Sequence, residues 1–122
     1  MMPEAWLDRE HARLRQLLED GEKLLEARPV GLGFHPGLLA VTDRRLLHLY
    51  FRRLVRRMKV TEMRYQRLNW VELHRWRRCV EFRASIDLGD GGIKWYYLPV
   101  HKDADAAPLL DAIRAACPRL VA

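Results

Sequence analysis

The stretch GLLAVTDRRLLHLYF, residues 37–51, decides the fold of this chain. Two apolar runs, LLAVT and LLHLYF, flank the short polar segment DRR. Apolar runs joined by a tight polar turn indicate a β-hairpin. In the second run Leu47, Leu49 and Phe51 fall on one side of the predicted strand, because side chains alternate along a strand. The centre of the chain is therefore predicted to be β-sheet.

The period of two continues on both sides of this hairpin. Further strands are predicted in EKLLEARPV before it, and in VRRMKVTEMRY, LNWVELHRW, CVEFRASIDL and IKWYYLPV after it. The glycine-rich segment GDGG predicts a turn between the last two strands. Connections this short join antiparallel neighbours, so the sequence predicts seven mostly antiparallel strands between about residues 22 and 100.

Helical periodicity marks the two ends of the chain. A helix is predicted over about residues 3–20, with Trp6, Leu14 and Leu18 on its apolar stripe. A second helix is predicted over about residues 104–117. The whole chain, residues 1–122, is predicted to form a single mainly β domain with flanking helices.

Charge is spread unevenly along the chain. The 22 Lys and Arg residues against 16 acids give a net charge of +6. Residues 44–83 hold 13 of these cations and only three acids, a balance of +10, and the remainder carries −4. No apolar run is long enough to span a membrane, and no signal peptide is recognisable. Two cysteines, Cys79 and Cys117, are too few for a disulfide framework and predict a cytoplasmic location.

The basic residues around two predicted strand connections are the candidate binding site. Alternate connections of an antiparallel meander emerge at the same end, so we expect residues 52–57 and 75–78 to converge. The predicted partner-binding residues are Arg52, Arg53, Arg56, Arg57, Lys59, Arg75, Arg77 and Arg78. They predict a non-catalytic module that presents a basic surface to a protein partner, to itself or to an anionic membrane. A solvated edge that resists aggregation would carry the same residues.

Nucleic-acid binding is the alternative function for segment 44–83. Arginines beside aromatic side chains are typical of proteins on which single-stranded bases stack. The last predicted strand is apolar on both faces, one carrying Tyr96 and Leu98 and the other Trp95 and Tyr97. One face is predicted to be core, and the other to meet the N-terminal helix or another subunit, as in a homo-oligomer.

No pattern in the sequence indicates catalysis, a metal or a cofactor. The five histidines are scattered without metal-ligand spacing, and the only serine, Ser85, lies within a predicted strand. The acids of the basic segment, Glu62, Glu72 and Glu81, are expected to neutralise nearby arginines rather than to form an acid/base pair. We therefore expect no enzyme, no cofactor, no metal and no small-molecule substrate.

The phrases LEDGEKLLEARPV, GLLAVTDRRLLHLYF and DAAPLLDAIRAA resemble bacterial PH-like domains, the YokE-like PH domain family in particular. The shared positions are Gly21 and Glu22, then residues 37–42, Asp43 and Arg45, and the likeness covers about residues 14–117. It implies a PH-like seven-stranded antiparallel barrel with a C-terminal capping helix, used for binding rather than catalysis. We interpret Asp43 and Arg45 as turn geometry plus a surface ion pair.

Phosphoinositide-binding PH domains carry Lys and Arg around the loop between their first two strands. Here the corresponding segment, ARPVGLGFHPGLL, holds only Arg28 and His35 as basic residues. The sequence therefore does not predict a phosphoinositide pocket at this loop.

Overall fold

The computed structural model describes residues 4–31, 37–52, 57–77, 80–100 and 103–121, with backbone alone for 4–8, 51–52 and 103–105. The elements are α1 (Glu4–Leu17), β1 (Leu24–Val30), β2 (Gly37–Thr42), β3 (Arg45–Arg52), β4 (Arg57–Arg64), η1 (Tyr65–Arg67), β5 (Leu68–Arg75), β6 (Val80–Asp87), β7 (Ile93–Val100), α2 (Asp103–Ala116) and η2 (Pro118–Leu120). The order of helix, seven strands and helix that the sequence predicts is confirmed.

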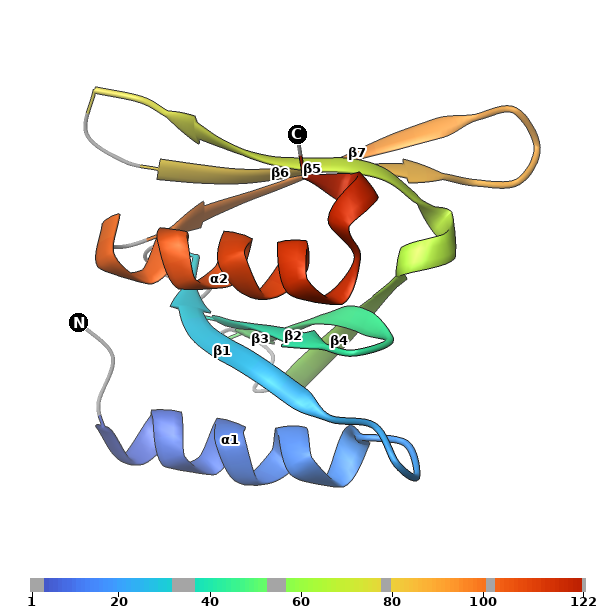
Figure 1. Cartoon of the computed structure of the whole chain (residues 1–122). Coiled ribbons are helices and arrows are strands. Elements are labelled where there is room, and N and C mark those ends of the chain that lie inside the picture. The colour runs from blue at the N-terminus through green and yellow to red at the C-terminus, as the bar shows by residue number, and fades with distance from the viewer. Residues whose placement is uncertain (1–3, 32–36, 53–56, 78–79, 101–102, 122) are drawn as a thin grey trace.

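All seven strands belong to one antiparallel sheet in the order β4-β3-β2-β1-β7-β6-β5. The sheet folds over between β1 and β7, which pair only at Val30 and Val100. This produces two layers, β1–β4 and β5–β7, connected on the other side by the short helix η1 (Figure 1). The edge strands of the folded sheet are β4 and β5. The fold is thus a PH-like barrel that is open between its two edges.

Helix α2 lies between the two layers and fills the interior of the barrel (Figure 1). Its apolar residues Leu109 and Ile113 are fully buried and share one core with Leu39 of β2 and Phe82 of β6. Each such side chain stabilises the fold by roughly 1.5–3 kcal/mol through burial. The predicted capping role of the C-terminal helix is confirmed.

Helix α1 covers the outer face of the β1–β4 layer (Figure 1). Leu14 is fully buried in a second core with Leu38, Leu47 and Leu49, the residues of the hairpin that point away from the barrel interior. One of the two expectations for β7 therefore fails, because the N-terminal helix packs on the opposite layer. The outer face of β7 is left without this cover.

A buried ion pair fixes the end of α1 to the β2–β3 hairpin. The Arg45 guanidinium donates to both carboxylate oxygens of Glu22, from Nε and Nη2, at 2.9 Å each. Its Nη1 donates to Glu62 at 2.8 Å, and Nη2 also donates to the Leu17 carbonyl at the end of α1. Thr42 donates its hydroxyl to Glu22 at 2.7 Å. The interpretation of Arg45 as a surface ion pair is therefore wrong, because only 7% of its surface is exposed.

The residues that carry the family resemblance meet in this network. Glu22, Thr42 and Arg45 form its centre, and Asp43 accepts a hydrogen bond from the backbone N–H of Lys23. Gly21 has φ of 76°, a left-handed conformation that glycine adopts without strain. These positions therefore have a structural role in the turn between α1 and β1.

Gly37, at the start of β2, lies where the backbone of β3 approaches closely. A Cβ atom at this position would meet the Leu49 carbonyl oxygen at 2.7 Å and His48 Nε2 at 2.9 Å. We expect Gly37→Ala to destabilise the fold by about 1–3 kcal/mol, the usual cost of overpacking a core. Urea unfolding of the two proteins measures the difference, and equal midpoints would contradict the close packing of β2 on β3.

Candidate interaction surface

The outer face of the β5–β7 layer carries large apolar side chains that no described element covers. Its exposed fractions are 58% for Ile93, 49% for Trp95, 51% for Tyr97 and 53% for Trp76, which follows β5. Figure 1 shows this face on the side of the layer away from α2. We call Trp70, Trp76, Arg83, Ile93, Trp95 and Tyr97 the aromatic face. Contiguous exposed apolar surface of this kind marks interaction sites.

A small residue at the centre of this face allows two tryptophans to meet. Ser85 of β6 pairs with Trp70 of β5 on one side and with Trp95 of β7 on the other. The two indole rings contact edge to face above it, with centroids 5.0 Å apart, and Ser85 itself is only 2% exposed. Asn69 donates its side-chain amide to the Ser85 hydroxyl at 3.2 Å. The only serine of the chain therefore has a packing role.

Arg83 occupies the middle of the aromatic face and connects its two ends. Its guanidinium carbon lies 5.5 Å from the ring centre of Trp76 and 5.7 Å from that of Tyr97. Its Nε donates to Glu81 at 2.8 Å, and Nη1 lies 3.8 Å from Glu72. Arginine stacked between aromatic rings is held rigidly. Two carboxylates neutralise it, so the centre of the face has no excess of positive charge.

Trp95 should contribute little to folding. About half of the side chain is exposed, and its described ring contact is the edge-to-face pair with Trp70. Because such a pair contributes about 0.5–1.5 kcal/mol, we expect Trp95→Ala to lower the free energy of unfolding by about 1 kcal/mol. Chemical denaturation measures this loss. A loss above about 3 kcal/mol would indicate that the indole belongs to the core.

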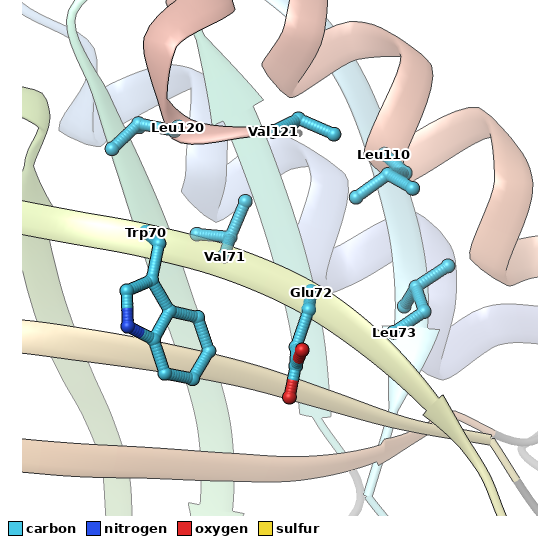
Figure 2. A pocket seen from close by; sticks show the side chains of 7 residues that line it. All are labelled: Trp70, Val71, Glu72, Leu73, Leu110, Leu120 and Val121. Atoms are coloured by element: carbon cyan, nitrogen blue, oxygen red, sulfur yellow. The ribbon is translucent and has the colours of Figure 1, made fainter.

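An open groove of about 350 Å³ runs along the edge strand β5 (Figure 2). Val71 and Leu73 form one wall, and Leu110 of α2 with Leu120 and Val121 after it forms the other. Figure 2 shows Trp70 and Glu72 pointing to the opposite side of β5 from Val71. We call this feature the edge groove. It is apolar, and it lies beside a strand that pairs with β6 on one side alone among the described strands.

The structure places the predicted basic residues at two edges of the sheet. Arg57 and Lys59 are exposed on β4, and the Lys59 ammonium lies 5.9 Å from the ring centre of Tyr50. Arg75 and Arg77 are exposed at the end of β5, at the other end of the strand order. Arg53, Arg56 and Arg78 lie outside the described residues, as does the side chain of Arg52. The convergence of the two groups on one surface stays a prediction.

Several other arginines of the basic segment are paired with acids. Glu62 contacts both Arg45 and Arg64, and Glu72 and Glu81 both contact Arg83. The prediction that these three acids neutralise nearby arginines is confirmed. Glu19 additionally pairs with Arg64 at 2.7 Å and with Arg44 at 3.6 Å. The +10 balance of residues 44–83 therefore overstates the positive charge available to a partner.

A buried histidine lies inside the barrel. His48 is 5% exposed, its Nδ1 is 2.5 Å from the Tyr96 hydroxyl, and its ring stacks on Tyr50 with centroids 4.9 Å apart. Burial lowers the pKa of His48 to about 4, so the ring is neutral at pH 7. Within the described ranges no three His, Cys, Asp or Glu side chains gather in a way that could hold a metal ion. No described helix has the length and apolarity required to cross a membrane.

A PH-like barrel with an uncovered aromatic face is the class that this structure defines. The hSac2 domain from human phosphoinositide phosphatase Sac2 has a similar fold, with a TM-score of 0.65 over 95% of this chain and 84% of that one. The two sequences are 10% identical, so the likeness shows the fold alone. No protein-family model and no curated protein matches the chain.

The sequence identified part of this surface. The two apolar faces of the last predicted strand indicated that one of them would be left for a partner or for α1, without indicating which. The structure shows that it is the face of Trp95 and Tyr97. Sequence reasoning missed the roles of Arg83 and Trp70, because they depend on which residues of β6 lie beside β5 and β7. The alternation of Trp70 with Val71 in LNWVELHRW was the available signal.

Proposed function

We propose that this protein is a non-catalytic binding module whose partner is another protein, docked on the aromatic face. One observation carries the proposal: the half-exposed side chains of Trp76, Trp95 and Tyr97 gather on a sheet face that no described element covers. Tryptophan, tyrosine and arginine dominate the binding energy of protein interfaces. The rigid sheet beneath them holds these side chains ready for contact, which reduces the entropy cost of binding.

The charges of the face favour a protein over a phosphate backbone. Arg83 is held by Glu72 and Glu81, and these carboxylates would repel phosphates that approached the rings. Nucleic-acid binding by segment 44–83 is therefore the less favoured function. The exposed cations Arg75 and Arg77 lie at the end of β5 and just after it, and in this proposal they select acidic groups at the rim of the interface.

The wider expectations belong to the same proposal. In this proposal the exposed cations Arg57 and Lys59 of β4 contribute to a second basic surface for an acidic protein or an anionic membrane. Membership of the YokE-like PH domains, self-association and a cytoplasmic location are proposed from the sequence. The similar Sac2 domain supports the fold on which this proposal rests.

The proposal is tested with a double variant, Trp76→Ser with Trp95→Ser, and a control, Arg13→Glu with Arg15→Glu, on the exposed side of α1. Sedimentation velocity detects self-association, and affinity capture from cells that make the protein detects other protein partners. We expect the tryptophan variant to lose the complex at unchanged fold, and the α1 variant to keep it. A complex that survives the loss of both tryptophans would contradict the proposal.

Two further titrations separate the other partner classes. Anionic vesicles test the membrane, and single-stranded oligonucleotides at about 50 and 200 mM salt test nucleic acid. Binding to phosphates weakens steeply with salt, whereas docking on an apolar face does not. We expect that Trp95→Ser changes neither binding to the vesicles nor binding to the oligonucleotides. Salt-sensitive oligonucleotide binding that is lost with Trp95→Ser would indicate that the aromatic face binds nucleic acid rather than a protein.

A further inference from the structure

We propose that the edge groove binds an extended peptide segment with acidic residues at both ends, which adds to the sheet as a strand beside β5. The inference rests on the proposed function and names the kind of segment that the protein partner would supply. It follows from three features of the described residues: a free strand edge, an apolar wall and the charges at the two ends of the strand.

The free edge supplies backbone hydrogen bonds. Strand β5 lies at the end of the strand order and pairs with β6 on one side alone in the described part of the chain. At its first residue the edge is already used, because Arg119 of η2 donates from Nη1 to the Leu68 carbonyl at 2.9 Å. From Trp70 to Arg75 the edge borders the groove. A peptide can pair with such an edge as an added strand.

The walls of the groove suit a strand with alternating side chains. Val71 and Leu73 point to the same side of β5 as Leu110 and Val121, whereas Glu72 points to the other side (Figure 2). Side chains directly opposite each other in antiparallel strands lie on the same face. Every second residue of the added strand therefore packs against α2 and η2 and should be apolar. The residues between them extend the aromatic face.

The charges around the free edge of β5 indicate which kind of peptide the edge groove binds. Arg67 and Arg119 are exposed at the beginning of β5, and Arg75 and Arg77 are exposed at its end. The acid beside the groove is Glu72, in the middle of the strand, and its side chain points away from the apolar wall (Figure 2). Strand β5 spans seven rises from Leu68 to Arg75, about 23 Å at 3.3 Å per residue, and Arg67 directly precedes it. An incoming strand of about nine residues with acids at both ends matches these charges.

The same charges disfavour a second copy of the chain as the strand that pairs with β5. Antiparallel pairing of two β5 strands about Val71 places Arg67 of one copy opposite Arg75 of the other. Pairing about Glu72 places Arg67 opposite Arg77 and brings the two Glu72 residues together. Like charges directly opposite one another destabilise strand pairing. In these two registers the arginines therefore oppose pairing of two β5 strands, whereas an acidic segment meets no such repulsion.

A displayed library of nine-residue peptides, randomised at every position, tests the inference on the full chain. We expect the selected peptides to carry Asp or Glu near both ends and apolar residues at alternate positions. Amide chemical shifts of the ¹⁵N-labelled protein should change at residues 69–75, 110 and 121 when such a peptide is added. Selected peptides without terminal acids, shifts confined to other elements, or no enrichment at all would overturn the inference.

Alternate N-methylation of a selected peptide tests strand addition itself. Successive amides of a strand point to opposite edges, so methylating one alternate set should abolish binding and methylating the other set should leave it intact. Equal behaviour of the two methylated peptides would contradict pairing with β5. A peptide that merely fills the groove would show that equal behaviour.

Charge reversal with a matched control completes the test. We expect Arg67→Glu with Arg77→Glu to weaken binding of the selected peptide about tenfold, and the same charge change in Arg13→Glu with Arg15→Glu to alter it by less than about twofold. Equal weakening by both variants would overturn the assignment of the acidic ends. If the peptides fail at β5 while a complex that needs Trp95 persists, strand addition falls and the proposed function stands. If instead the peptides bind at β5 and no complex depends on Trp95, docking on the aromatic face is contradicted and binding in the edge groove is supported.

Discussion

Replacing Arg45 by alanine should lower the free energy of unfolding by about 3–5 kcal/mol, the largest loss expected for any single change outside the apolar core. The change leaves the Glu22 carboxylate, whose side chain has 0% exposure, without its two guanidinium hydrogen bonds. It also removes a donor from the Leu17 carbonyl at the end of α1. Urea denaturation monitored by circular dichroism measures the loss.

Two comparisons separate this cause from loss of side-chain volume. Arg64→Ala removes an arginine that also pairs with Glu62, but Arg64 lies at the surface, and a much smaller effect is expected. The double variant Arg45→Met with Glu22→Gln removes both charges and should recover most of the stability that Arg45→Ala loses. Equal losses in Arg45→Ala and Arg64→Ala would contradict the description of a buried ion pair.

Stability should fall as the pH is lowered from about 6.5, well before ordinary carboxylates are protonated. Burial lowers the pKa of His48 from 6.5 to about 4, so between these values the unfolded chain binds the proton that the folded protein excludes. The contribution is complete above pH 6.5 and is lost progressively down to pH 4. A shift of this size corresponds to about 3 kcal/mol. Thermal unfolding at a series of pH values measures it.

A second decline is expected below pH 4.5, and Glu22 contributes to it. Burial alone would raise the pKa of this carboxyl, but hydrogen bonds from Arg45, the Glu19 backbone N–H and Thr42 lower it from 4.5 to about 2. The stability that the carboxylate provides is therefore present above pH 4.5 and lost as the pH falls toward 2.

His48→Asn is the matched variant for the first decline. Asparagine has no titration in this range and can still reach the Tyr96 hydroxyl, the partner of His48 Nδ1. We expect the slope between pH 6.5 and 4.5 to disappear in this variant and the slope below pH 4.5 to remain. A slope between pH 6.5 and 4.5 that persists without His48 would assign the effect to another group.

The local pattern of the sequence was sufficient to predict the secondary-structure elements of the fold. Period-two runs predicted all seven strands, and the run IKWYYLPV coincides with β7, Ile93–Val100. The hairpin of residues 37–51 is correct because the turn and its two strands are contiguous, so their pairing needs no information from elsewhere in the chain.

The positions of helices and charges depended on contacts between distant residues. Arg45 looked like a surface residue because Glu22, its partner, is 23 positions away. Arg44 and Arg64 counted as available charge until the fold placed Glu19 beside them. Helix α1 covers the β1–β4 layer because Leu14 packs with Leu38 and Leu49. No periodicity in the sequence specifies this contact.

Photo-crosslinking from the aromatic face tests the central claim most directly. A benzoyl-phenylalanine residue replaces Trp95 in one protein and Leu25 of β1 in another, because both side chains are about half exposed and they lie on different layers. In cells that make the protein, we expect a discrete protein adduct from position 95 and none from position 25. Equal adducts from the two positions, or none from position 95, would contradict docking on the aromatic face.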